Sequence, residues 1–317
     1  MKLLVTFAAL VSLVAGGVVP PVPGDNSHYV EGKSRYLWEA DGDGNPVLVD
    51  LHEPVDEEMQ DPRRGEENEY WLYTRMNPST PQIITHGDES SIWASHYLGS
   101  RPIKVIVHGY AGNGNSEINS LLTSAWLSVI DANVIVVDWR RLASSNYLTA
   151  VSQAPNVGRA IGDFITWLIN TGGGNWNEVH FTGFSLGGQI AGNAGRFTGG
   201  RPRRVTGLDP VSPLWYYNIN AIGRNAGQYV EIIHTYYTRN NSPRIGHVDF
   251  YPNGGTDQPG CLTSICSHTR SYRLFASTIR TNHLVGRECL TMEEAQSNQC
   301  SGSVTLNMGN SITNKNG

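Results

Sequence analysis

The sequence lacks three features, and each absence argues against a class of protein. It has no excess of positive charge, because 23 Lys and Arg face 28 Asp and Glu and leave a formal net charge of −5. A net negative charge argues against nucleic-acid binding and against binding to anionic membranes by electrostatic attraction alone. After the first residues no apolar run approaches the length of about 18 residues that a membrane span needs, so we expect a soluble mature protein.

Cysteine is also scarce, and its four copies all lie in the last fifth of the chain. An even number of cysteines in a secreted protein indicates disulfides, and four cysteines allow three pairings. Of these, the sequence-local one is favoured. A zinc site is the alternative, but the spacings fit it poorly and we expect no metal. The residues are Cys261, Cys266, Cys289 and Cys300.

The N-terminus has the layout of a secretory signal peptide over residues 1–17, with a lysine, an apolar run and small residues. A buried strand is the alternative reading. Residues 18–68 are rich in Pro, Gly, Asp and Glu, and we interpret them as an N-terminal segment or a propeptide, with Arg63-Arg64 as a candidate processing site. Residues 69–317 are expected to form one folded domain of an extracellular protein. Asn240 begins an N-x-[ST] sequon and is a candidate glycan site.

From residue 70 onward, short apolar runs alternate with helical stretches. This alternation predicts an α/β protein with a mostly parallel central sheet and helices on both faces. The predicted strands are 104–107, 133–137, 178–182, 204–208 and 229–233, and one helix face is predicted over 157–169.

Gly183-Phe-Ser-Leu-Gly187 is a G-x-S-x-G between a predicted strand and a Gly-rich helical segment. In that context the pattern predicts a nucleophile elbow that exposes Ser185, with an ordinary glycine-rich turn as the alternative. Serine is a poor nucleophile without a histidine base that is itself held by an acid. Asp209 follows the next strand and is the candidate acid, although an Asp-Pro turn explains it too. For the base, spacing leaves four candidates open: His234, His247, His268 and His283.

An oxyanion hole needs two backbone N–H groups beside the nucleophile. One is predicted at Leu186, directly after the serine. The other is predicted at Tyr110, in the loop that follows strand 104–107, where Gly109 lets the backbone approach the substrate. His108 in the same loop is interpreted as structural.

Together these segments resemble the secreted animal lipases of the pancreatic lipase family, especially its insect members, over roughly residues 70 to 290. The resemblance implies an α/β-hydrolase fold, no cofactor, and a triad of Ser185, Asp209 and His268 with hole donors Tyr110 and Leu186. The motifs are Val107-His-Gly-Tyr110, Val136-Val-Asp-Trp139, Gly183-Phe-Ser-Leu-Gly187, Gly207-Leu-Asp-Pro210, His247-Val-Asp-Phe-Tyr-Pro-Asn-Gly-Gly255 and Cys266-Ser-His-Thr-Arg-Ser-Tyr272.

The sequence departs from the family in three places. Phe184 stands before the serine, where members usually carry histidine. The chain ends soon after the catalytic domain, so we expect no C-terminal β-sandwich and no colipase partner. Only residues 262–265 separate the two cysteines that match the borders of the family's lid, and the loop 236–246 is short. A vestigial lid and short loop resemble the phospholipase A1 members.

Three functions are therefore weighed. The leading one is a secreted lipid esterase of the phospholipase A1 type, whose substrate partner is a lipid at a membrane or lipid surface. The second is a triacylglycerol lipase or general carboxylesterase on the same triad. The third is a non-catalytic lipid-binding protein like the yolk proteins that share this fold, although those lack a working nucleophile.

Overall fold

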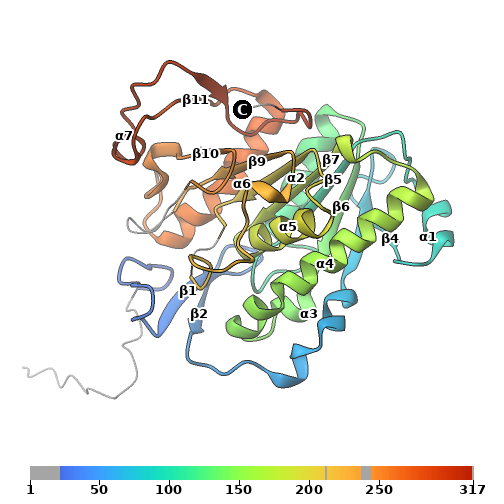
Figure 1. Cartoon of the computed structure of the whole chain (residues 1–317), viewed down its shortest axis with the longest axis horizontal. Coiled ribbons are helices and arrows are strands. Elements are labelled where there is room, and N and C mark those ends of the chain that lie inside the picture. The colour runs from blue at the N-terminus through green and yellow to red at the C-terminus, as the bar shows by residue number, and fades with distance from the viewer. Residues whose placement is uncertain (1–21, 211–212, 237–243, 316–317) are drawn as a thin grey trace, which may run out of the picture.

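The computed structural model describes residues 22–210, 213–236 and 244–315. A central sheet of eight strands contains β3 (Glu69–Tyr73), β4 (Gln82–Ile84), β5 (Ile103–Val107), β6 (Asn133–Asp138), β7 (Val179–Phe184), β8 (Arg204–Leu208), β9 (Tyr229–Ile233) and β10 (Val248–Phe250). Their order across the sheet is β10-β9-β8-β7-β5-β6-β3-β4 (Figure 1). The six strands from β10 to β6 pair in parallel, and β3 and β4 close the far edge in antiparallel pairing. The mostly parallel sheet predicted from the sequence is confirmed.

The parallel strands are continuous apolar runs because both of their faces are covered. Along β5 the side chains alternate between two hydrophobic cores: Val105 and Val107 belong to one, and Ile106 belongs to the other. In β6, Ile135 and Val136 divide in the same way. A strand whose side chains enter both cores cannot expose either face to solvent. These apolar runs therefore place β5 and β6 in the interior of the sheet.

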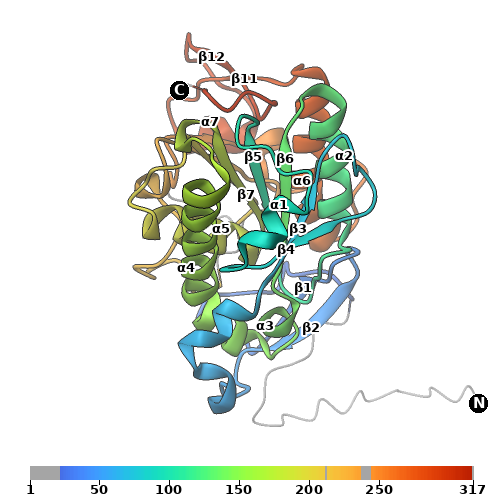
Figure 2. The ribbon, with the colours of Figure 1, turned by 90° about the vertical axis from the view of Figure 1, so that its right-hand side faces the viewer.

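Helices cover both faces of the sheet (Figure 2). The helices are α1 (Glu89–Trp93), α2 (Glu117–Val129), α3 (Arg140–Ala143), α4 (Tyr147–Gly172), α5 (Leu186–Phe197), α6 (Ser264–Thr281) and α7 (Met292–Ser297). On one face α4 packs against α5, and on the other α2 packs against α6. Loops from both faces of the sheet therefore meet at the carboxyl ends of the parallel strands, which is where ligands bind in sheets of this kind.

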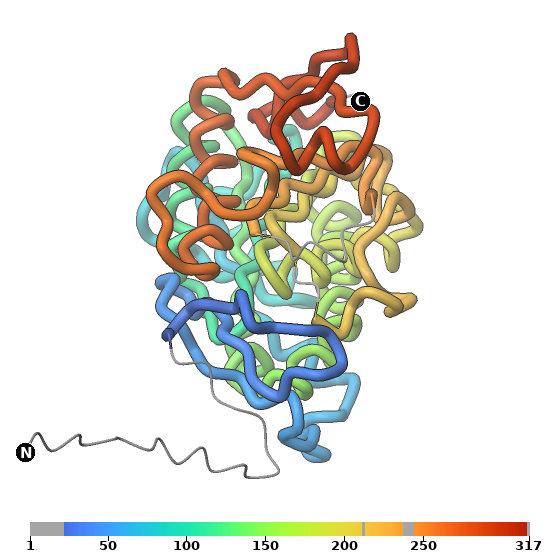
Figure 3. Tube along the Cα trace, turned by 90° about the vertical axis from the view of Figure 1, so that its left-hand side faces the viewer, coloured from blue at the N-terminus to red at the C-terminus, as the bar shows by residue number. Residues whose placement is uncertain are grey.

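A hairpin precedes the central sheet and forms a two-stranded sheet of its own, β1 (Tyr36–Ala40) paired with β2 (Pro46–Asp50). Leu37 and Val49 are buried in one core and Ala40 in the other, so the hairpin packs on the domain rather than beside it. Short 3-10 helices over Glu57–Gln60 and Pro62–Glu67 lead from it to β3. Figure 3 shows this N-terminal segment in blue, near the orange part of the chain that leads into α6.

The C-terminal part adds the hairpin β11 (Val285–Arg287) with β12 (Thr305–Asn307), and then a tail that contacts side chains of β8 and β9. Arg204 of β8 is fully buried there and bonds Glu231 of β9 at 3.0 Å. Its guanidinium also donates to the carbonyl oxygens of Gly309 and Ile312, at 2.7 and 2.6 Å. Lys315 completes the cluster, 2.5 Å from the Glu231 carboxylate. The tail thus supplies hydrogen-bond acceptors for the guanidinium that Arg204 buries in the sheet.

Candidate active site

Ser185 lies where β7 turns into α5, in a backbone conformation that few side chains adopt. Its φ of 55° and ψ of −127° are held by the surrounding structure. A Cβ at Gly183 would lie 1.9 Å from the Gly187 carbonyl oxygen, and one at Gly187 would lie 2.3 Å from that of His108. Both glycines are therefore required by space, which is the geometry of a nucleophile elbow.

Asp209 follows β8 at the same edge of the sheet, and backbone donors fix its carboxylate. Its Oδ1 accepts hydrogen bonds from the amides of Thr235 and Tyr236, at 2.9 and 3.2 Å. Its Oδ2 lies 2.6 Å from Nδ1 of His268. The amide of Tyr236 also donates to Oδ2, at 3.1 Å, so backbone donors hold both oxygens while Oδ2 faces the imidazole.

His268 comes from the second turn of α6, whose start is fixed in two ways. The Thr263 hydroxyl caps the helix by accepting from the amide of Cys266, and a disulfide joins Cys266 to Cys261. Burial alone would lower the pKa of the imidazole, but the hydrogen bond to Asp209 and the negative charges of Asp209 and Glu39 raise it above its ordinary value. A base whose proton affinity is increased by its acid is suited to take a serine proton.

The other histidines lie elsewhere. His234 is buried beside Asp249, 3.0 Å from its carboxylate, and His247 accepts from the amide of Val230. His283 is exposed next to Thr281. His108 is fully buried and stacks on Trp139, with its Nε2 3.3 Å from the Trp139 amide. The structure thus pairs only His268 of the four candidates with Asp209, and it gives His108 a packing environment that fits a structural role.

The predicted oxyanion-hole donors lie on the two segments that border the serine. A Cβ at Gly109 would come within 3.2 Å of the Ser185 Cβ, so the loop that carries Tyr110 runs against the nucleophile. The Leu186 amide is the first of α5. Among the described residues neither amide has a hydrogen-bond acceptor, and both are free to meet a developing negative charge.

Two further side chains adjoin these residues, and of the two only Glu39 was not singled out from the sequence. The Phe184 ring lies 4.5 Å from the His268 ring, between it and Tyr272. Glu39 of β1 is buried at 4 % exposure. Burial raises the pKa of its carboxyl, against the lowering effects of His268 and of the Tyr147 and Ser185 hydroxyls. No sequence signal marks Glu39, because it stands in an acidic segment outside every motif.

The serine and the base are close neighbours of this carboxyl but are not bonded to each other. Within the described part of the chain, Ser185 Oγ and His268 Nε2 each lack a hydrogen-bond partner. Ser185 is 1 % exposed and His268 is 8 % exposed. Asp209 and His268 are thus joined, whereas Ser185 is enclosed.

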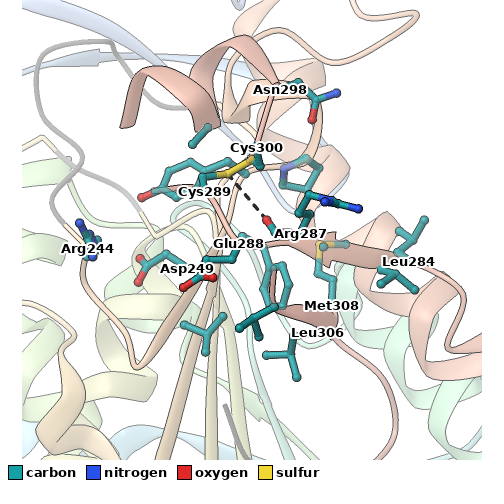
Figure 4. A pocket seen from close by; sticks show the side chains of 18 of the residues that line it. Arg244, Asp249, Leu284, Arg287, Glu288, Cys289, Asn298, Cys300, Leu306 and Met308 are labelled. Atoms are coloured by element: carbon teal, nitrogen blue, oxygen red, sulfur yellow. Dashed lines mark hydrogen bonds between the residues drawn. A yellow bond between two sulfur atoms is a disulfide. The ribbon is translucent and has the colours of Figure 1, made fainter. Parts of the chain in front are cut away.

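The disulfides follow the sequence-local pairing, Cys261 with Cys266 and Cys289 with Cys300. Within the first loop, Ser264 already belongs to α6, so no flap separates the two cysteines. The second disulfide borders a cavity of about 1030 Å³ between β10 and the C-terminal hairpin (Figure 4). Triad residues do not line this cavity, although Leu306 and Met308 do.

Several expectations fall on residues whose structure is not described. The signal peptide (1–17), Asn240 and most of the loop 236–246 lie outside the described residues. In the described part, no helix has the length and apolar character to cross a membrane.

Comparisons with known proteins relate the chain to a family. The family model described as Lipase matches residues 37–316. Pancreatic lipase-related protein 2 of Bos taurus is 32% identical over 73% of this chain and 55% of its own length. Pancreatic triacylglycerol lipase of Myocastor coypus is 31% identical over 73% of this chain and 57% of its own length, so the chain spans little more than half of these relatives. The solved structure of Est1E from Butyrivibrio proteoclasticus is similar over 67% of this chain and 91% of that one, with 12% identity and a TM-score of 0.37.

Proposed function

The chain belongs to the lipase family, and on that premise we propose that it is a secreted serine esterase that hydrolyses acyl esters of lipids in the manner of a phospholipase A1. The observation that carries the proposal is the 2.6 Å contact between His268 and Asp209 at the rim that holds the strained Ser185. A strained serine with glycines packed around it and a paired imidazole nearby are the components of acyl transfer.

In the proposed reaction, Ser185 Oγ attacks the ester carbonyl carbon while His268 Nε2 takes the hydroxyl proton. Asp209 keeps Nδ1 protonated and stabilises the imidazolium that forms. The oxyanion accepts hydrogen bonds from the amides of Tyr110 and Leu186, and loss of one such donor costs roughly 100- to 1000-fold in rate. Collapse passes the His268 proton to the departing alcohol and leaves an acyl-serine, which water then hydrolyses to a fatty acid.

The phospholipase A1 assignment is supported by the small disulfide loop. Leu262 and Thr263 are the only residues between Cys261 and the start of α6, and they offer little apolar surface to cover the site or to grip an oil droplet. An open rim of this kind leaves room for a phospholipid headgroup in water.

A triacylglycerol lipase is the second candidate. It is favoured by the likeness to the pancreatic triacylglycerol lipase of Myocastor coypus. Secretion is proposed on the signal-peptide pattern of residues 1–17 and on the two disulfides, which persist in oxidising compartments.

The test compares the wild-type protein with its Ser185→Ala variant on phosphatidylcholine labelled at the sn-1 or sn-2 ester, beside a triglyceride emulsion. Release from sn-1 by the wild type alone supports the proposal. If the wild type prefers triglyceride, the result supports the triad, but the protein is then the second candidate, a triacylglycerol lipase, and not a phospholipase. If folded wild type releases no fatty acid from any ester, the catalytic proposal fails and a non-catalytic lipid-binding protein takes its place.

A further inference from the structure

The side chain directly before the serine packs on the proposed base. The centroid of the Phe184 ring lies 4.5 Å from that of the His268 imidazole, with an angle of 39° between the two ring planes. Phe184 is 3 % exposed and His268 is 8 % exposed, so water is largely kept from this contact. The last residue of β7 therefore touches the ring that has to reach the serine next to it.

One hydrogen bond does not fix the orientation of the imidazole. Nδ1 of His268 lies 2.6 Å from Oδ2 of Asp209, but within the described residues Nε2 has no hydrogen-bond partner. A ring held by a single hydrogen bond can tilt about that bond, and Nε2 then moves relative to Ser185. The contact with Phe184 opposes this tilt, because close packing leaves a buried ring few other positions.

The Phe184 ring is itself held by its surroundings. The ring of Tyr272 in α6 meets it at 86°, with 5.0 Å between the centroids, and the Tyr272 hydroxyl donates to Glu117 of α2 at 2.6 Å. A Cβ at Gly109 would come within 3.3 Å of Cδ1 of Phe184, so the loop that carries Tyr110 also packs closely on this ring. Phe184 thus cannot move aside without disturbing both α6 and that loop.

An aromatic face also suits the charge that the base acquires in the proposed reaction. When His268 takes the serine proton it becomes a cation, and a cation within about 6 Å of an aromatic centroid is attracted by the ring quadrupole. The separation of 4.5 Å lies inside this range. The charged groups that bear on the imidazole are the carboxyls of Asp209 and Glu39. The phenyl ring adds to their effect on the cation without carrying a charge of its own.

Other side chains at position 184 would lack one of these two properties. An aliphatic side chain fills space, but it has no quadrupole and does not favour the imidazolium. A histidine is aromatic, but in its protonated form it would place a like charge beside His268 and oppose the uptake of the proton. Phenylalanine restrains the imidazole and favours its protonated form at every pH.

We propose that Phe184 is a positioning residue, whose ring holds the imidazole of His268 with Nε2 toward Ser185 and stabilises the imidazolium that forms there. Its effect on the reaction rate rests on the proposed function. Its effect on the protonation of His268 can be measured whether or not the protein hydrolyses an ester.

The first test follows the protonation of His268 by NMR in 15N-histidine-labelled protein without substrate. The chain has ten histidines, and the His268 signals are those missing from His268→Gln protein. Phe184→Leu should lower the pKa of His268, because the protonated ring loses its aromatic partner. Water that entered in place of the ring would have the opposite effect, since burial lowers this pKa. An unchanged or higher pKa would overturn the proposal.

Phe181→Leu is the matched control for this test. Phe181 is also fully buried on β7, but its side chain enters the other hydrophobic core. The same substitution there should lower Tm by the loss of packing and leave the pKa of His268 as it is in wild type. If both variants changed that pKa equally, general loosening of β7 would explain the result and the specific role of Phe184 would be wrong.

The second test measures kcat and KM for a soluble short-chain ester. Phe184→Leu should lower kcat by roughly 2- to 30-fold with little change in KM, because the ring contacts the base and not the ester. Phenylalanines with one, two or three ring fluorines keep the shape of the side chain but weaken its quadrupole, so kcat should fall with each added fluorine. A kcat that stays at the wild-type value in all of these proteins would overturn the proposal.

The two proposals fail in different ways. If the wild type hydrolyses no ester, the proposed function fails, while the titration of His268 still decides whether Phe184 favours its protonated form. If the wild type hydrolyses esters and Phe184→Leu lowers only Tm, with kcat and the pKa of His268 unchanged, the triad stands and Phe184 serves packing alone.

Discussion

Asparagine in place of Asp209 tests the proposed triad, because the backbone donors around Asp209 bias which way the new amide points. Oδ1 of Asp209 accepts from the amide of Thr235 at 2.9 Å, whereas the amide of Tyr236 is shared between Oδ1 and Oδ2, so we expect the asparagine oxygen to keep the bond to Thr235. Its NH2 group then occupies the position of Oδ2, which lies 2.6 Å from Nδ1 of His268. Nδ1 must accept a hydrogen bond there, and the proton moves to Nε2, where a base has to be free.

The expected loss follows from the burial of this pair. The His268 and Asp209 side chains are 10% and 4% exposed. Removing one partner of a buried charged pair costs about 3–5 kcal/mol. If that cost falls on the imidazolium of the transition state, the rate drops by roughly 100- to 4,000-fold, since each tenfold is about 1.4 kcal/mol. The raised pKa of His268 should also fall, which moves the acidic limb of the pH–rate profile to lower pH.

The assay compares kcat for a soluble short-chain ester across pH, in wild type and Asp209→Asn. Asp249→Asn is a matched control, because Asp249 is also buried, lies 3.0 Å from a histidine (His234) and accepts from two backbone amides. That variant should change stability without changing the pH profile. If Asp209→Asn keeps more than about a tenth of the wild-type rate, or if Asp249→Asn loses as much, the assignment of the acid is wrong.

Three further predictions concern stability. Gly183→Ala should lower the free energy of unfolding in urea by about 4 kcal/mol or more, because its Cβ would meet a backbone oxygen at 1.9 Å. A smaller loss would show that the backbone around Ser185 moves to make room for the methyl group. Cys261→Ser/Cys266→Ser should cost about 2 kcal/mol by loop entropy and lower Tm; an unchanged Tm would contradict this. Burial lowers the pKa of Lys104 to about 7 from 10.5. Between these two pH values the lysine is protonated in the unfolded chain but not in the folded one. The free energy of unfolding should therefore rise with pH there, by up to about 1.4 kcal/mol per pH unit. Lys104→Met should flatten that rise between about pH 7 and about pH 10, and an unaltered slope would assign it to other groups.

The parallel strands were predictable because their signal is local. Runs such as 204–208 and 229–233 match the observed strands in both bounds. The helix expected over 157–169 extends instead from Tyr147 to Gly172 and continues through Pro155, because tertiary packing outweighs the loss of one backbone donor. The helix α6 was missed, although Tyr272, Phe275 and Ile279 recur at helical spacing and mark its buried face.

The residues of the candidate site likewise divide into those that local sequence pattern predicts and those that depend on tertiary packing. Ser185 and Asp209 stand at strand ends, where the sheet geometry places them at one rim, and these positions follow from sequence pattern alone. The choice of His268 needed the family resemblance, because its distance from Asp209 depends on how α6 packs. Glu39 could not be found in either way, since a strand among acidic and glycine residues gives no sign that one carboxyl will be buried beside a serine.

Arg204 has a consequence for how the chain folds during its synthesis. Its buried guanidinium in β8 is satisfied by Glu231 and by carbonyl oxygens of residues 309–312, about a hundred positions later. A buried arginine with most of its acceptors missing is strongly unfavourable. While the ribosome is still making residues 260 to 300, the central sheet therefore holds an incomplete charge cluster and stays short of its final packing. We therefore expect the docking of residues 309–315 to be a late step in the folding of this domain.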